Sequence, residues 1–160
     1  MRTATLIVMI AATAMAADDP GGWTAAKWGM TDAQILAAIP SATRLDPPDA
    51  GAHVHIKSFD LAGAAFHVLF QSDKDGRLQA VLLSPVGDPA EGIDHLFQTL
   101  QHLLVEKYGR PWTSTEGHET EIQWSLKTTT IALSRVKFPG MDIQILNLHY
   151  KRKSADLDKM

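Results

Sequence analysis

The sequence predicts an α+β fold in which an antiparallel sheet of about six strands carries two helices on one face. Two observations predict it. Apolar residues recur at helical spacing in two segments, 31–39 and 88–108. After each of these segments, apolar and polar residues alternate in short runs that are joined by turn residues such as glycine and aspartate. The resulting order also allows a tandem repeat of one helix plus three strands.

The N-terminal segment has the pattern of a secretory signal peptide. Arg2 supplies a positive charge, residues 3–14 are apolar, and Ala14-Met15-Ala16 is a small-residue cleavage site. The apolar run is too short for a stable membrane anchor, which needs about 20 residues. We therefore expect residues 1–16 to be removed and the protein to be periplasmic or secreted, with no integral membrane segment in the mature chain.

Composition restricts the remaining chain. The sequence has no cysteine, which excludes disulfides, thiolate metal sites and cysteine nucleophiles. Its formal net charge of −3 gives no reason to expect nucleic-acid binding. Residues 28–150 have the size of a single α+β domain. Residues 17–27, rich in Pro, Gly and Asp, predict an irregular lead-in, and residues 151–160, which begin Lys-Arg-Lys, predict a basic polar tail.

The first helix and the strands after it have local signals. Thr31 and Gln34 have the residue types and spacing of a capping box, and Pro40 ends the helix. Residues 41–52 contain two prolines and a glycine and predict a loop. Three strands of an antiparallel meander are then expected at 53–59, 65–70 and 78–83.

Turn placement predicts how the first two strands pair. A three-residue turn over Leu61–Gly63 pairs Ile56 with Val68 and Val54 with Phe70, so the apolar side chains share one face. This face is expected to lie against the helices.

The second helix is expected to begin with Asp88 as N-cap and Pro89 at its first position, and to end at Gly109. Its predicted buried stripe consists of Ile93, Leu96, Phe97, Leu100, Leu103, Leu104 and Tyr108. Further strands are expected around 122–126, 131–133 and 142–150, with a short one at 112–115. The apolar phase changes within 142–150, which predicts a bulge or a strand covered on both faces.

Two motifs together carry a resemblance. Trp28-Gly29-Met30-Thr31 opens the first helix, and Tyr108-Gly109-Arg110-Pro111 closes the second. In these motifs and in the layout of the mature chain, the sequence resembles small exported bacterial proteins whose helix-plus-meander unit is similar to that of the β-lactamase inhibitor protein and of the small lipoprotein of the outer-membrane β-barrel assembly machine. The resemblance implies this fold. The chain lacks the lipoprotein's lipidated cysteine and the inhibitor's disulfides, and no site residues are transferred.

Histidines are the candidate metal ligands. His53 and His55 lie two residues apart, so a strand places both on one face, and the predicted pairing sets His67 opposite Lys57 and diagonal to His55. Three imidazoles in this arrangement suit zinc or copper, although the charge of Lys57 opposes a bound cation. A periplasmic zinc- or copper-binding protein is therefore the alternative function.

The preferred function is an exported binding or interaction module, not an enzyme, and it needs no cofactor. The sequence shows no Ser-His-Asp spacing, no G-x-S-x-G element and no Gly-rich phosphate loop. A hydrolase whose site cannot be read from spacing is a third, weaker alternative. The expected partner is a protein or a small ligand. Trp23 and Trp112 are the candidate binding anchors, because aromatic side chains dominate interface energetics.

Overall fold

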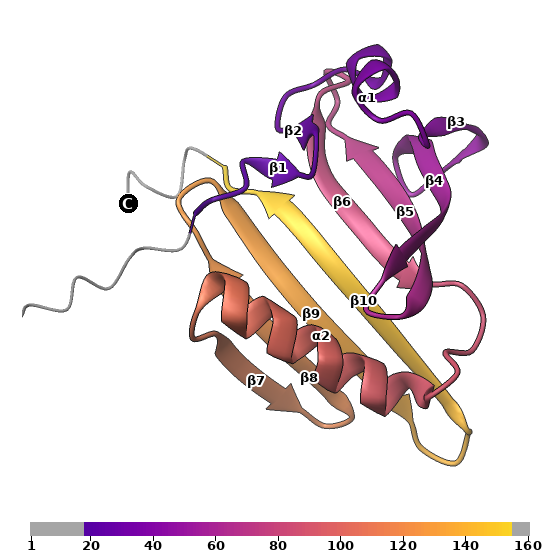
Figure 1. The fold of residues 1–160 in the computed structure, drawn as a ribbon, viewed down its shortest axis with the longest axis vertical. Coiled ribbons are helices and arrows are strands. Elements are labelled where there is room, and N and C mark those ends of the chain that lie inside the picture. The colour runs from indigo at the N-terminus through magenta and orange to yellow at the C-terminus, as the bar shows by residue number, and fades with distance from the viewer. Residues whose placement is uncertain (1–17, 155–160) are drawn as a thin grey trace, which may run out of the picture.

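The computed structural model describes residues 18–154 and contains one large antiparallel sheet, two helices and a small separate hairpin (Figure 1). The helices are α1 (Asp32–Ala38) and α2 (Gly92–Tyr108). The large sheet comprises β3 (Thr43–Asp49), β4 (Ala52–Leu61), β5 (Ala64–Ser72), β6 (Leu78–Pro85), β7 (Trp112–Glu116), β8 (Glu119–Ser125), β9 (Thr129–Phe138) and β10 (Ile143–Arg152). The hairpin comprises β1 (Gly22–Trp23) and β2 (Ala26–Lys27). The predicted α+β class is confirmed, with more strands than the sequence predicted. The predicted signal peptide lies outside the described residues.

The large sheet consists of two four-stranded meanders that meet at their last strands. The strand order is β3-β4-β5-β6-β10-β9-β8-β7, and neighbouring strands are antiparallel. Helix α1 precedes the first meander and α2 precedes the second. Each half is therefore a helix followed by four strands, one strand more than the repeat predicted from the sequence.

The two helices begin for different reasons. The Thr31 hydroxyl accepts a hydrogen bond from the Gln34 N–H, and the Gln34 side chain accepts one from the Thr31 N–H, so the predicted capping box is confirmed. The predicted Asp88 cap of the second helix is wrong. Gly92 has a φ of +83°, outside the helical region, so the chain turns there and the helix starts only at this residue, preceded by Glu91 without a side-chain cap.

The predicted register of the first meander is confirmed, although the predicted turn is wrong. Ile56 pairs with Val68, and Val54 pairs with Phe70. The turn, however, contains only two residues, Ala62 and Gly63, with φ values of +53° and +78°. A register shift between Ile56 and Phe59 compensates for the shorter turn.

Three segments that were predicted to be irregular are ordered as strands. Residues 43–49 form β3 instead of part of a loop, at an edge of the sheet where prolines are tolerated. Residues 22–27 form the β1–β2 hairpin instead of an irregular lead-in. Lys151 and Arg152 belong to β10, because they pair with Thr130 and Thr129 of β9, so the expected tail is shorter than residues 151–160.

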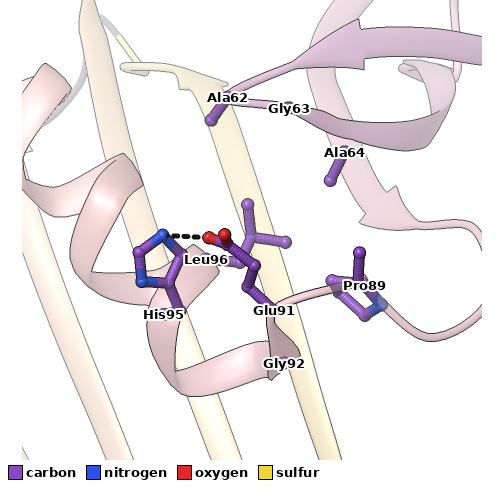
Figure 2. Close-up of a pocket in the computed structure, with 9 residues that line it drawn as sticks. Ala62, Gly63, Ala64, Pro89, Glu91, Gly92, His95 and Leu96 are labelled. Atoms are coloured by element: carbon purple, nitrogen blue, oxygen red, sulfur yellow. Dashed lines mark ion pairs between the residues drawn. The ribbon is translucent and has the colours of Figure 1, made fainter.

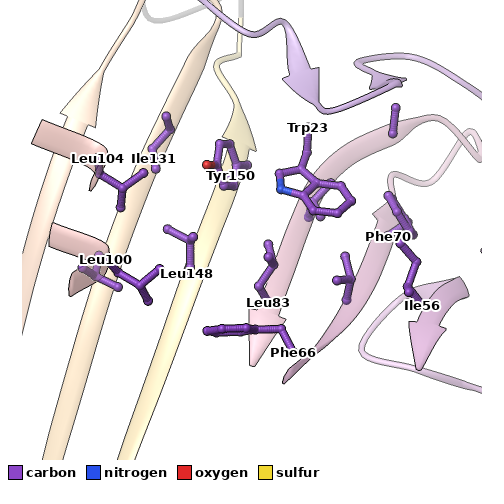
Figure 3. Close-up of a cluster of buried hydrophobic side chains, with 14 of the residues drawn as sticks. Trp23, Ile56, Phe66, Phe70, Leu83, Leu100, Leu104, Ile131, Leu148 and Tyr150 are labelled. Atoms are coloured by element: carbon purple, nitrogen blue, oxygen red, sulfur yellow. The ribbon is translucent and has the colours of Figure 1, made fainter. Parts of the chain in front are cut away.

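The core lies between the helices and one face of the sheet (Figure 3). Leu100 and Leu104 of α2 point toward Ile131 and Leu148 of the sheet. The predicted burial of Leu103 is wrong, since this side chain is 42% exposed. At 100° per residue, Leu103 falls just outside the arc that the buried residues of α2 cover. The apolar stripe is therefore narrower than predicted.

Candidate functional site

The candidate site is the face of the sheet opposite the two helices, which we call the helix-free face. Side chains alternate along each strand, so residues between the core positions point to this face. Cross-strand pairing places one such residue from each of seven strands in a single row across it. The row consists of His55, Leu69, Leu82, His149, Ala132, Gln123 and Trp112.

Large exposed apolar side chains cluster on the helix-free face. Ile143 pairs with Phe138 and Ile145 pairs with Val136, so the four side chains are direct neighbours on β9 and β10. Ile143, Ile145 and Phe138 are 52%, 45% and 40% exposed. We call these four residues the apolar patch. Trp112, on the same face in the edge strand β7, is 62% exposed. Contiguous exposed apolar side chains are typical of interaction surfaces.

Three carboxylates lie beside the apolar patch. Glu119 is the cross-strand neighbour of Val136, Glu116 is the neighbour of Glu119, and Glu121 is the neighbour of Ser134. The ion pairs found within residues 18–154 do not involve these glutamates. Glu116 and Glu119 lie directly opposite each other, an arrangement that destabilises a hairpin. This half of the helix-free face is therefore apolar and negatively charged.

Two of the predicted metal ligands are brought together at the other side of the same face. His55 Nδ1 lies 2.8 Å from His67 Nε2, which is a hydrogen-bond distance. Burial, followed by the positive charges of His67 and Lys57, lowers the pKa of His55 below its usual value. His67 and His55 are therefore close together, as the sequence predicted. His53 lies on β4 and is exposed, and no group of three or more potential ligands converges within the described part of the chain.

Zinc and copper titrations test the metal-binding alternative. We expect binding weaker than about 1 µM at pH 7.5, because a tight site needs three or four protein ligands and only two imidazoles meet. Any binding should strengthen as the pH rises, since neutral imidazole is the ligand, and His55 should lose its proton below pH 6.5 because its pKa is lowered. The measurement is calorimetry on the wild type, with His55→Ala and His67→Ala as test variants and His102→Ala on α2 as the control. Stoichiometric sub-micromolar binding that His55→Ala abolishes would contradict this expectation.

A third histidine occupies the middle of the helix-free face. His149 lies between Leu82 and Ala132 in the cross-strand row, and its buried Nε2 atom has no hydrogen-bond partner. Burial, together with the charge of Lys151, lowers the pKa of His149 to about 4. No local pattern predicts the burial of His149, because burial by neighbouring strands depends on the order of the strands in the sheet.

His149 should make stability depend on pH. Its pKa falls from about 6.5 in the unfolded chain to about 4 in the folded protein, so the unfolded chain binds the proton more tightly. The contribution of His149 is complete above pH 6.5 and is lost as the pH falls toward 4. The unfolding free energy of the wild type should fall between pH 7 and pH 4.5. In His149→Leu this fall should be smaller by about 1–2 kcal/mol, a figure that allows for the partial exposure of His149.

Urea unfolding at several pH values measures this effect. The control is His102→Leu, whose side chain is exposed on α2 and should leave the pH dependence as in the wild type. Identical pH profiles for His149→Leu and the wild type would rule out a neutral, buried His149.

A pocket of about 280 Å³ lies away from the helix-free face, between the β4–β5 turn and the start of α2 (Figure 2). Its ionisable side chains are His95 and Glu91, whose Nε2 and Oε2 atoms lie 2.6 Å apart. Both side chains are more than half exposed. The pocket's other lining residues, among them Ala64, Pro89 and Leu96, are not ionisable, so the lining points to no particular class of ligand.

The two predicted tryptophan anchors lie in different environments. Trp112 is exposed on the helix-free face, whereas Trp23 is buried and does not present a surface to which a partner could bind. The β1–β2 hairpin inserts Trp23 into the core, where its ring centroid lies 5.0 Å from that of Phe59 and 5.9 Å from that of Phe70. Figure 3 shows the indole between Phe70 and Tyr150.

Sequence reasoning missed the apolar patch, although a signal was present. The change of apolar phase within 142–150 predicted a bulge or a strand covered on both faces, and both expectations are wrong. Pairing between β9 and β10 is continuous, so Ile143 and Ile145 point to the helix-free face while Leu146 and Leu148 point to the core. The change of phase thus marks apolar residues that the described part of the chain leaves uncovered.

Comparisons with protein-family models, with curated proteins and with solved structures find no match to this chain. The resemblance of its motifs to exported helix-plus-meander proteins therefore stays a prediction. Within residues 18–154, neither helix combines the length and the apolar character that crossing a membrane requires.

Proposed function

We propose that this protein is an exported interaction module that binds a protein partner over the helix-free face of its sheet. The observation that carries the proposal is the apolar patch, together with the exposed Trp112 on the same face. Burying each of these side chains against a partner would be favourable, at roughly 25 cal/mol per Å² of apolar surface. The four patch residues are neighbours in cross-strand register on β9 and β10. Trp112 lies in the row of Ala132 on the same face, and the glutamates and Ser134 lie between it and the patch.

The dimensions of the face favour a protein over a small ligand. Neighbouring strands lie about 4.8 Å apart, so a sheet of eight strands is on the order of 35 Å wide. An ordinary protein interface covers about 800 Å² on each partner, which such a face accommodates. Small-molecule sites are instead concave and enclose most of the ligand. The apolar patch instead lies on the open, pleated surface of the sheet.

Site-specific photo-crosslinking in living cells tests the proposal. A photoreactive residue at Ser134 or Gln123, both on the helix-free face, should form an adduct with the same partner. The same residue at His102, which is exposed on α2, should not. Ile145→Asp should abolish the adduct from Ser134 without lowering the melting temperature, because Ile145 is half-exposed. An adduct from His102 alone would place the interface on the helices and refute the proposal.

Export is the second part of the proposal and rests on the signal-peptide pattern of residues 1–16. We expect the protein in the periplasmic fraction to begin at Ala17 or Asp18. N-terminal sequencing of protein purified from that fraction measures this. Recovery of the uncleaved chain from the cytosol would contradict it.

A further inference from the structure

The two edges of the large sheet differ in how they are protected against pairing with another strand. The edge strand β3 contains Pro47 and Pro48, which lack an N–H group, and its register with β4 is broken between Arg44 and Asp49. The opposite edge strand, β7, pairs with β8 without a register shift and contains neither proline nor lysine. Within residues 18–154, no strand pairs with its outer edge. The β7 edge therefore lacks the usual protection against strand addition.

The main chain of β7 presents hydrogen-bonding groups along this edge. Glu116 and Glu119 are paired across a two-residue turn, which makes them a hydrogen-bonded pair of the hairpin. Residues alternate between bonding to the neighbouring strand and pointing away from it. Thr113 and Thr115 therefore direct their N–H and C=O groups to the outer edge. An added strand could therefore form backbone hydrogen bonds with these two residues at the usual spacing.

The side chains beside this edge favour a positively charged segment. Glu116 lies in β7 itself, and Glu119 and Glu121 lie in the adjacent strand on the same face. The two cations of the β9 strand, Arg135 and Lys137, are on the helix side, where they form ion pairs with Asp94. A lysine or arginine of an added strand would relieve the repulsion between the opposed Glu116 and Glu119.

We propose that the outer edge of β7 accepts an extended, positively charged segment of a protein partner as a ninth strand of the sheet. The segment carries lysine or arginine at alternate positions facing the glutamates, and an apolar residue that packs on Trp112. The inference rests on the proposed function, because the edge is continuous with the helix-free face at Trp112, and it adds the recognition mode and the charge of the partner.

A second copy of the chain is a poorer occupant of the same edge. Antiparallel pairing of β7 with β7 of another molecule would double the number of carboxylates at the junction, and β7 itself contains no cation to offset them. A heterologous segment avoids this repulsion, and low salt should strengthen its binding.

The experiment selects linear peptides of about twelve residues, long enough to span a strand, from a random phage-displayed library against the exported chain. The selected peptides should carry lysine or arginine at alternate positions. Amide hydrogen exchange, followed by NMR, should slow by at least about tenfold at Thr113 and Thr115 when the synthetic consensus peptide binds. Methylation of alternate peptide nitrogens on the pairing edge should abolish binding. Exchange of the peptide's basic residues for glutamate should weaken binding by at least about tenfold.

Two pairs of substitutions complete the test. Glu119→Gln with Glu121→Gln should weaken peptide binding several-fold. Glu91→Gln with Glu106→Gln removes the same charge from exposed positions before and within α2 and should leave binding unchanged. Thr115→Pro should abolish binding, since an edge strand tolerates proline where the N–H points outward. The N-methylated peptide gives the same information if this variant does not fold.

Several results would overturn the inference. Acidic selected peptides, or no selection at all, would show that the edge does not take a cationic strand. Slow exchange of β7 without peptide would show that the edge is already occupied, by a second copy if sedimentation finds a dimer or by the chain's own terminus if it finds a monomer. A peptide that perturbs Ala132 and Ile145 but not β7 would overturn the edge inference and leave the proposed function supported.

Discussion

Replacing Trp23 with alanine is expected to lower the free energy of unfolding by about 3–5 kcal/mol, the usual cost of emptying a buried tryptophan site. The indole is only 6% exposed and contacts the rings of Phe59 and Phe70 edge-on. Its removal takes away both apolar burial and aromatic contacts, and it loosens the β1–β2 hairpin that carries it.

Trp112 supplies the matched control. Trp112→Ala removes the same side chain from a site that is 62% exposed, so its effect on stability should stay within about 0.5 kcal/mol. Urea unfolding at pH 7 measures both variants. Equal unfolding midpoints would show that Trp23 does not belong to the core. Because Trp112 lies on the helix-free face, Trp112→Ala should also weaken photo-crosslinking from Gln123, its cross-strand neighbour.

The second large effect is expected for Leu100→Ala, at about 2–5 kcal/mol of unfolding free energy. Leu100 is 1% exposed and lies in the middle of the stripe that α2 packs on the sheet. Leu103→Ala makes the same chemical change three residues away, in the same helix, at a position that is 42% exposed. Both substitutions alter helix propensity equally, so the difference between them reports burial alone.

Denaturant unfolding of the two leucine variants measures that difference directly. We expect Leu103→Ala to cost less than about 1 kcal/mol, as is usual for surface substitutions. A cost for Leu103→Ala as large as that for Leu100→Ala would mean that α2 is rotated about its axis from the orientation described.

Structural features were predictable from the sequence where the interacting residues are close together in the chain. The capping box of α1 joins Thr31 to Gln34 within one turn of helix. The pairing of Ile56 with Val68 followed from the alternation of apolar residues, because a one-residue slip would have turned the apolar set toward solvent. That constraint was strong enough to preserve the register even though the turn is one residue shorter than predicted.

Predictions failed where a contact distant in sequence decides the outcome. Residues 22–27 look irregular locally, yet the hairpin is stabilised by burying Trp23 against β4 and β5. Asp19 also accepts hydrogen bonds from the hydroxyls of Thr128 and Thr129, which ties the preceding segment to the β8–β9 turn. Neither contact has a signature within the segment itself.

The candidate site was predictable only in part. Trp112 and the proximity of His55 to His67 follow from exposure and strand pairing within one half of the chain. The apolar patch and the three glutamates come together through the pairing of β8, β9 and β10, which also decides that no helix covers them. That the glutamates share one face can be predicted only when the register of these strands is known.

By itself, the sequence determined the α+β class, the capping box of α1 and the register of the first meander, because these depend on composition and on residues close together in the chain. The tertiary structure alone decided that β6 and β10 join two meanders into one sheet, which face of that sheet the helices leave free, and which edge is unprotected. The physical reason is that burial and pairing at these positions depend on residues far apart in the chain, whose meeting no local pattern encodes.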